Sequence, residues 1–289
     1  MRTLLKLLVS LALLGVAFYY LDWASLKEAL LEVNLWVFIV STLIFASHYI
    51  LLALRWHLLL DSNIILPLKE NVRIYLYSIF LNTFTPVNVG GDIYRFFSLK
   101  DQTPDKLTVI VLILKERILG ILGCFSVYLI LFAGLWLTNT KWLLNSGKVL
   151  FYPGVLMLFG TIWIILIPYV LRIISKLRSV CDRTRFYNSV VSLYDAMYFN
   201  SLPHFAKLMG LSFLSLLIWI LAVQIFAIDL RLHISCWYVG TIAILVELVR
   251  LIPITIQGVG LREGTYAYLF DILGKSPEDG FVLGTVSYL

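Results

Sequence analysis

The chain has 289 residues, of which 61% are hydrophobic and 14% charged, and its mean hydropathy is +0.92. A soluble domain has about 45–50% apolar and about 25% charged residues, and it could not cover this much apolar surface with polar side chains. The composition therefore excludes a cytosolic enzyme, a nucleic-acid-binding protein and a disordered chain. It predicts an all-α protein, a polytopic bundle of transmembrane helices whose net charge of +6 reflects Lys and Arg in cytoplasmic loops.

Apolar stretches long enough to cross a bilayer predict the membrane spans in chain order. They lie at about 1–20, 35–54, 118–137, 149–171, 208–228 and 234–252. Arg55, Trp56 and His57 are expected to form the aromatic and basic border of the second span. The last apolar stretch, 281–289, would cover only about 13 Å as a helix, so we expect an incomplete final span of a longer chain.

Basic residues between the two halves of the chain set the predicted orientation. The basic residues of this loop are Arg172, Lys176, Arg178, Arg183 and Arg185, against Asp182 alone. The positive-inside rule places loop 172–206 and the N-terminus in the cytoplasm. We expect a single integral domain of the cell membrane, residues 1–289, with halves of about 1–171 and 207–289. Counting spans from this loop puts both of the helix interruptions described next on the inner side.

Two apolar helices are interrupted by the same pattern, P-x4-G-x3-R. The aligned pairs are Pro86 with Pro253, Gly91 with Gly258 and Arg95 with Arg262, and Gly90 and Gly260 complete the two breaks. Proline ends the incoming helix, and glycine supplies the unusual dihedrals from which a new helix begins. Such breaks in corresponding places of two halves point to the binding site of a transporter. We predict two re-entrant hairpins forming a pseudo-repeat; the alternative is two ordinary cytoplasmic loops.

Charged residues inside the apolar stretches are the candidate site residues, since each costs roughly 2.5–3.5 kcal/mol to insert unless it faces a partner or a cavity. The restarting helices also offer N-terminal amides to an anion, although Asp92 is a natural N-cap for them. Glu247 and Arg250 share a helix face and either pair with each other or join the pocket. The predicted phosphate-binding residues are Arg95, Arg117, Arg250 and Arg262; the residues of the polar groove are Asp92, Glu116, Glu247, Glu263, Asn82 and Asn88.

These motifs resemble the flippase-like family that includes the membrane region of lysylphosphatidylglycerol synthase. The resemblance lies in Asn82-x3-Pro86-x3-Gly90-Gly91-Asp92-x2-Arg95, in Glu116-Arg117, and in Pro253-x4-Gly258-x-Gly260-x-Arg262-Glu263. It implies a membrane protein of about eight spans that handles lipids, and it gives functional roles to Asp92, Arg95, Glu116, Arg117, Arg262 and Glu263. Some members move aminoacylated phospholipids between leaflets. The resemblance does not include a soluble aminoacyl-transfer domain, so lysine transfer is not implied.

Three functions stay open at this point. The preferred one is a lipid translocator, not an enzyme, that moves an anionic phospholipid, an aminoacyl-phospholipid or a polyprenyl-phosphate-linked lipid between leaflets. The alternatives are a membrane enzyme that transfers a group to a lipid headgroup, and a non-catalytic partner of an envelope glycosyltransferase. Scattered cysteines and histidines predict no metal, and no cofactor is expected. The expected partners are membrane lipids and an envelope or lipid-modifying enzyme, not nucleic acid; the oligomeric state stays open.

Overall fold

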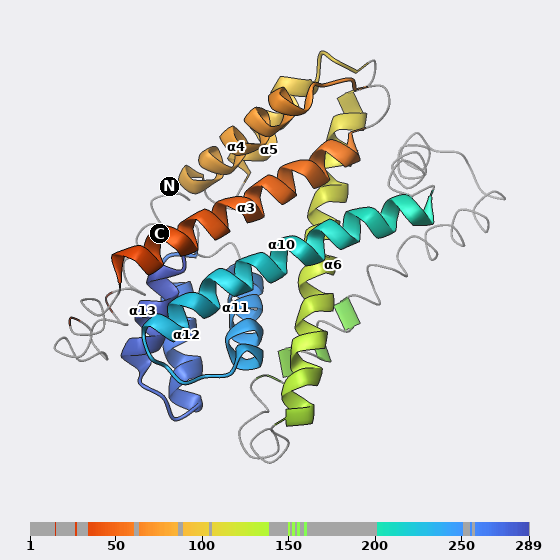
Figure 1. Ribbon diagram of the computed structural model, residues 1–289. Helices are drawn as coiled ribbons and strands as arrows, with labels where there is room; N and C mark the ends of the chain where they lie inside the picture. The colour runs from red at the N-terminus through yellow and green to blue at the C-terminus, as the bar shows by residue number, and fades with distance from the viewer. Residues whose placement is uncertain are drawn as a thin grey trace.

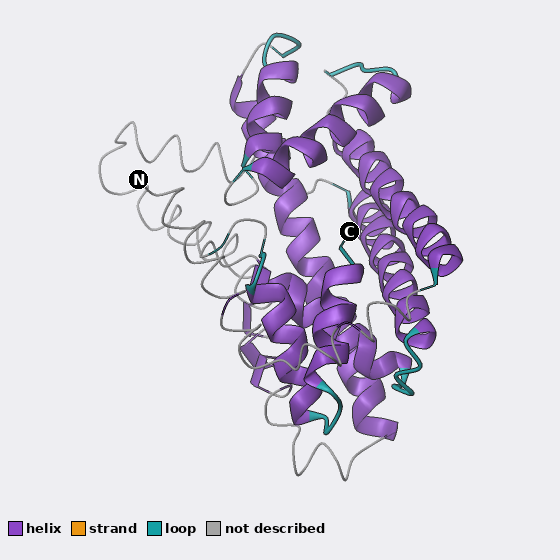
Figure 2. Cartoon of the chain, turned by 90° about the vertical axis from the view of Figure 1, so that its left-hand side faces the viewer, coloured by secondary structure: helices purple, strands orange, loops and turns teal. Residues whose placement is uncertain are grey.

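A computed structural model describes residues 34–60, 64–85, 89–103, 106–138, 201–250 and 258–288, with a few isolated positions elsewhere. Within these residues the chain forms eight helices and no strand (Figure 2), which confirms the all-α bundle. Three of the helices are long and apolar enough to cross a bilayer: α3 (Leu35–Leu59), α6 (Lys106–Thr138) and α10 (Leu202–Asp229). The spans predicted at 1–20 and 149–171 lie outside the described ranges, as does loop 172–206 up to residue 200.

The most extensive helix packing joins α3 and α10, which run antiparallel (Figure 1). At one end, the amide of Asn34 donates to the carboxylate of Asp229 over 2.8 Å. Further along, Nη1 of Arg55 donates to Oγ of Ser212, also over 2.8 Å. The long helix α6 crosses this pair and packs against both of its members. These three helices form the frame on which the shorter helices are placed.

The first interrupted segment forms a hairpin of α4 (Leu68–Phe84) and α5 (Gly90–Leu99). Its start is held against α3, because Nδ2 of Asn71 donates to the carbonyl of Ala53 over 3.1 Å. The helices α4 and α5 approach closely at Gly91, where a Cβ atom would lie 2.2 Å from the carbonyl oxygen of Ser78. The hairpin therefore enters the bundle at the end where α3 finishes, and it returns to the same end before α6 begins.

The second interrupted segment forms α11 (Cys236–Arg250) and α12 (Leu261–Ile272), followed by α13 (Pro277–Val286). The described part of α11 covers 15 residues, or about 22 Å. The apolar stretch at 234–252, predicted as a full span, supplies α11 as the first arm of the second interrupted segment. It starts at the end of the bundle where α10 finishes, opposite to the first hairpin. The expectation that both breaks lie on one side is wrong.

The described helices form an inverted repeat. Leu35 begins α3 and Leu202 begins α10, a spacing of 202 − 35 = 167 residues. Each long helix is followed by an interrupted hairpin and a further helix, and α3 and α10 point in opposite directions. Nδ1 of His48 lies 2.8 Å from the carbonyl of Ser215, exactly one repeat away along the chain. Equivalent residues contact each other where a two-fold axis passes, so the predicted pseudo-repeat is confirmed and its halves are inverted.

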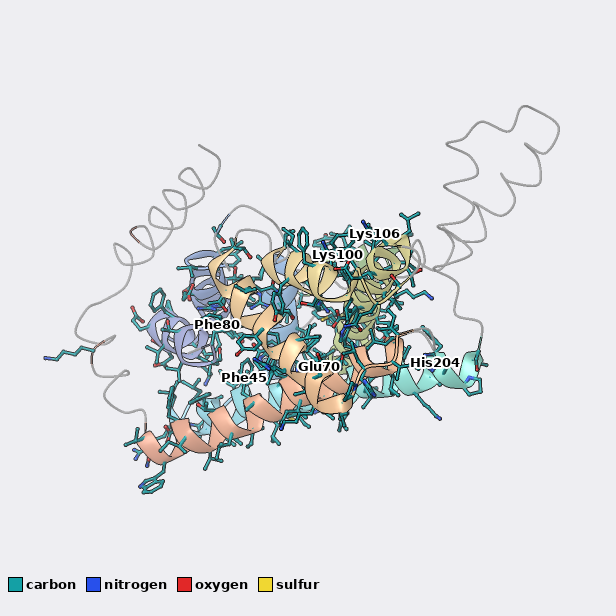
Figure 3. The ribbon with its side chains drawn as sticks, turned by 90° about the horizontal axis from the view of Figure 1, so that it is seen from above. Phe45, Glu70, Phe80, Lys100, Lys106 and His204 are labelled. Carbon is teal, nitrogen blue, oxygen red and sulfur yellow. The ribbon has the colours of Figure 1, made fainter. Side chains whose placement is uncertain are left out.

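The two ends of the bundle differ in charge. The end at which α4, α6 and α10 begin carries Lys69, Lys100, Lys106 and Lys207 against Glu70 and Asp101. In Figure 3, Glu70, Lys100, Lys106 and His204 all lie to the right of Phe45 and Phe80. The opposite end carries Asp229, Asp271, Glu278 and Asp279 against Arg231 and Lys275. Among the described residues, one end is thus basic and the other acidic.

Candidate functional site: a charged cavity between the two hairpins

A cavity of about 330 Å³ lies where the two interrupted hairpins approach α3, α6 and α10. Its charged lining residues are the arginines Arg55, Arg95, Arg117 and Arg250 and the carboxylates Asp92, Glu116 and Glu247. Among the described lining residues, four positive and three negative side chains give a net formal charge of +1. Both hairpins contribute to the lining, so the structure brings the two interruptions together. Among the predicted residues, Pro86, Asn88 and Pro253 lie outside the described part of the chain.

Arg95 is the centre of the cluster on the first hairpin and is only 5% exposed. Its guanidinium donates to Glu116 on α6 and, over 2.5 Å, to Asp92 one turn earlier on α5. The same guanidinium carbon lies 4.7 Å from the ring centre of Trp56 and 5.3 Å from that of Tyr75. Two carboxylates and two aromatic faces therefore hold a buried positive charge that would otherwise be costly.

Glu116 joins a second buried arginine to this cluster. Its Oε1 accepts a hydrogen bond from the hydroxyl of Tyr75 over 2.7 Å and lies 3.6 Å from Nη2 of Arg55. Arg55 and Trp56 were expected at the membrane border, but they are 5% and 0% exposed. That prediction is wrong because α3 continues to Leu59, which carries both side chains into the bundle.

Arg117 lies at the rim of the cavity, with 40% of its side chain exposed. Its Nε donates to Oδ2 of Asp92 over 2.7 Å. Because Asp92 is bonded to Arg95 and Arg117, it serves as a bridge between α5 and α6. Asp92 lies in the first turn of α5, and residue 89 is the N-cap of that helix.

The first amides of α5 are bonded within the protein, contrary to the expectation that they are available to an anion. The amide of Gly91 donates to Oδ1 of Asn82 over 2.7 Å, and the amide of Gly90 donates to Oγ1 of Thr85 over 3.0 Å. Neither glycine has a positive φ; Gly91 is required by the close approach of α4 and α5. Asn82 lines the cavity and also caps the restarting helix, so arginine side chains supply the donors of this site.

The second hairpin contributes an ion pair to the opposite wall. Nη2 of Arg250 lies 2.9 Å from Oε2 of Glu247, and the hydroxyl of Tyr288 donates to Oε1 of the same carboxylate. All three residues line the cavity. The two alternatives for Glu247 and Arg250 are therefore both correct: they pair with each other and they face the cavity. Gly258, with φ +80°, gives Arg250 room, since a Cβ there would lie 2.6 Å from Cγ of Arg250.

Arg262 and Glu263 are adjacent to this wall but do not line the cavity. Oε2 of Glu263 accepts from the amide of Gly260 over 2.7 Å, and its Oε1 accepts from Nε of Arg262 over 3.0 Å. The guanidinium of Arg262 lies 4.1 Å from the ring centre of Tyr288. These residues cap α12 and support the wall, with Gly260 supplying a positive φ of +81° at the turn.

The cavity residues that were missed from the sequence include His48, Arg55 and Tyr288. For Arg55 a signal existed, because three leucines follow at 58–60 and extend the apolar helix beyond it. Nothing in the local pattern around His48 or Tyr288 distinguishes them from packing residues. Their roles depend on contacts with residues 167 and 41 positions away.

A family model described as the lysylphosphatidylglycerol synthase TM region matches residues 3–287 of the chain. No curated protein and no solved structure matches it. The matched range contains both hairpins, all four cavity arginines and all three cavity carboxylates.

Proposed function

We propose a lipid-translocating function for this chain, which belongs to the family of the lysylphosphatidylglycerol synthase TM region and is thereby a membrane protein that acts on lipids. The observation that carries the proposal is the cavity with four arginines between two hairpins that enter from opposite ends of the bundle. A phosphate headgroup crosses a bilayer slowly because its charge must leave water. Arginine donors inside the bundle replace that hydration while the acyl chains stay in the bilayer.

The proposed substrates are lipids whose headgroup contains a phosphate: an anionic phospholipid, an aminoacyl-phospholipid or a polyprenyl-phosphate-linked lipid. We propose that the protein lies in the plasma membrane. The basic end of the bundle, with Lys69 and Lys106, then faces the cytoplasm. This agrees with a cytoplasmic N-terminus and loop 172–206. The first hairpin then enters from the cytoplasmic side and the second from the outer side. Movement of either hairpin would open the cavity to a different leaflet, as alternating access requires.

We propose transport without a chemical step. The carboxylates of the cavity are engaged by arginine and tyrosine donors, and Nδ1 of His48 is bonded to a backbone carbonyl. Carboxylates and imidazoles that are engaged in this way hold their partners in place. A catalytic base instead needs an acceptor atom that can reach a substrate proton. Mass spectrometry of lipids incubated with the purified protein tests this point: a modified headgroup would indicate an enzyme.

The test of translocation uses purified protein in liposomes with fluorescent phosphatidylglycerol, where a membrane-impermeant quencher reports movement between leaflets. Arg117→Gln removes a partly exposed donor at the cavity rim, so folding should be retained. Loss of a charge-assisted bond worth about 1.5–3 kcal/mol predicts transport slower by about tenfold to a hundredfold. Arg73→Gln, an equal charge change on the exposed face of α4, is the control and should be neutral. Equal rates in protein-containing and protein-free liposomes would overturn the proposal.

A further inference from the structure

His48 lies where the two halves of the inverted repeat meet, and it lines the cavity. Its contact with Ser215 joins equivalent positions of the two halves, so the two-fold axis passes beside the imidazole ring. In an inverted repeat that spans a bilayer, this axis lies in the membrane plane, and substrate sites are found near it. A headgroup that crosses from either leaflet therefore passes His48 at the middle of its path.

Neighbouring aromatic rings hold the imidazole of His48 in one orientation. The ring of Phe45 stacks on it, with centroids 5.8 Å apart and an interplanar angle of 19°. The ring of Tyr49 meets it at 67°, with centroids 5.2 Å apart. All three side chains come from α3 and line the cavity. Because these contacts restrict rotation of the imidazole, its nitrogens keep fixed places relative to the cavity.

The contact with Ser215 decides which nitrogen of His48 carries the hydrogen. A backbone carbonyl only accepts, so Nδ1, 2.8 Å from the carbonyl oxygen of Ser215, is the donor, and the acceptor of the neutral ring is Nε2. An imidazolium would add a second positive charge to a described lining that already has one in excess, so the neutral ring is favoured. Within the described part of the chain no group donates to Nε2, and this nitrogen is not fully enclosed by protein.

A hydroxyl group suits this arrangement of His48 and the arginines. It donates to Nε2 through its hydrogen and can accept from a guanidinium through its oxygen. His48 and Arg55 are seven residues apart on one face of α3, which is about 10.5 Å along the helix axis, and both line the cavity. Since both side chains extend into the same space, a phosphate at the arginine and a hydroxyl at the histidine can belong to one short headgroup.

Resting on the proposed function, we propose that Nε2 of His48 determines headgroup specificity by accepting a hydrogen bond from a headgroup hydroxyl. The preferred substrates are then lipids whose phosphate is followed by a hydroxylated group, such as glycerol or a sugar. The cavity of about 330 Å³ has room for a small group of this kind. The contact serves recognition and not chemistry, because a general base would become an imidazolium beside the surplus arginine charge.

The first experiment compares two acyl-labelled lipids in liposomes that contain the full chain. Phosphatidylpropanol has the same phosphodiester charge and carbon number in its headgroup as phosphatidylglycerol, but it lacks the hydroxyls. We expect phosphatidylpropanol to move slower by about fivefold to a hundredfold, the usual effect of leaving a buried acceptor without its donor. Equal rates in the wild type would overturn the role of His48 while leaving translocation standing. No protein-dependent movement of either lipid would instead overturn the proposed function.

The second experiment locates the effect at Nε2. His48→Asn places an amide near the position of Nδ1, where it can still donate to the carbonyl of Ser215, but it supplies no acceptor at the position of Nε2. The ratio of phosphatidylglycerol to phosphatidylpropanol rates should fall toward one. His48→Gln places an amide oxygen near the position of Nε2 and should retain most of the wild-type ratio. His48→Phe keeps the stacking on Phe45 and removes both nitrogens, so its ratio should also fall toward one if the Asn variant does not fold.

His204→Asn is the matched control, because His204 is exposed at the start of α10 and does not line the cavity. It should keep the wild-type ratio of rates. A purely structural role of His48 would slow both lipids equally, so an unchanged ratio in a folded His48→Asn or His48→Phe variant would contradict the proposal. A His48→Gln variant as unselective as His48→Asn would likewise show that Nε2 is not the acceptor.

Discussion

Among substitutions that change a single atom of a cavity side chain, Glu116→Gln should lower the free energy of unfolding the most. This carboxylate is 4% exposed, accepts hydrogen bonds from Arg95 and Tyr75, and lies 3.6 Å from Arg55. Glu116→Gln keeps the shape of the side chain and removes its negative charge. Of the two buried guanidinium groups beside it, Arg95 then keeps Asp92 as a carboxylate partner, whereas Arg55 loses the carboxylate that lies next to it.

The expected loss follows from the burial of the pair. Removing one partner of a buried ion pair costs about 3–5 kcal/mol, because the remaining charge stays desolvated. We expect the lower end, about 3 kcal/mol, since the amide still accepts one hydrogen bond. Tyr75→Phe removes only a hydrogen bond to a charged group and should cost about 1.5–3 kcal/mol. Adding Arg55→Met to Glu116→Gln should recover part of the loss, because one uncompensated charge is then absent.

Reversible unfolding of the purified protein in mixed detergent micelles measures these differences, with the midpoint and slope compared between variants. The order of stability should be wild type, Tyr75→Phe, the Arg55→Met/Glu116→Gln double variant and then Glu116→Gln. A loss of unfolding free energy below about 1 kcal/mol for Glu116→Gln would refute the reasoning, because that is the value expected when a solvent-exposed ion pair is removed. A double variant less stable than the single one would refute the claim that Arg55 is held by this carboxylate.

Gly91→Ala should open the first hairpin and cost about 1–3 kcal/mol of unfolding free energy in the same measurement, while Gly264→Ala, which has open space around it, should cost little. Tyr288→Phe removes the hydroxyl that donates to Glu247 and should cost about 1.5–3 kcal/mol in the same measurement; a loss near zero would show that this bond does not support the cavity wall. In a cysteine-free background, cysteines at positions 106 and 275 should be labelled by an impermeant maleimide from opposite sides of the membrane, and labelling from one side would contradict the inverted arrangement.

Much of the site could be predicted because charge is rare and costly in apolar sequence. Arg95, Glu116 and Arg117 interrupt stretches that otherwise belong to the bilayer, so they had to have partners or a cavity. The pairing of Glu247 with Arg250 followed from their spacing on one helix face. In these cases the signal was local, and the structure agrees with it.

The remaining features depend on distant parts of the chain. Arg55 looked like a border residue because its partner Glu116 is 61 positions away. The direction of the second hairpin was predicted wrongly because 234–252 was counted as a full span, whereas α11 is the first arm of that hairpin and begins where α10 finishes. The free helix amides were predicted wrongly because the side chain that caps Gly91 comes from Asn82, on the other arm of the hairpin.

The repeat does not extend to the partners of the buried arginines, which explains why Arg55 and Arg95 share a buried carboxylate only in the first half of the described chain. The positions one repeat after Trp56, Tyr75 and Glu116 are Val223, Ile242 and Leu283, all at most 1% exposed. These apolar residues cannot hold a buried arginine. The arginine equivalent to Arg95 is Arg262, and it is paired with its own neighbour Glu263 beside the cavity wall instead of entering it.

The P-x4-G-x3-R pattern therefore accounts for two hairpins of similar backbone, and the partners around each arginine decide which hairpin binds charge. Placing a carboxylate at the position equivalent to Glu116, by Leu283→Glu, would bury a charge at a fully buried position. That change should unfold the protein and not create a second site, because an unpaired buried carboxylate costs several kcal/mol. A folded Leu283→Glu variant with higher phosphatidylglycerol transport would show that Arg262 can move into the cavity and that the two halves are interchangeable.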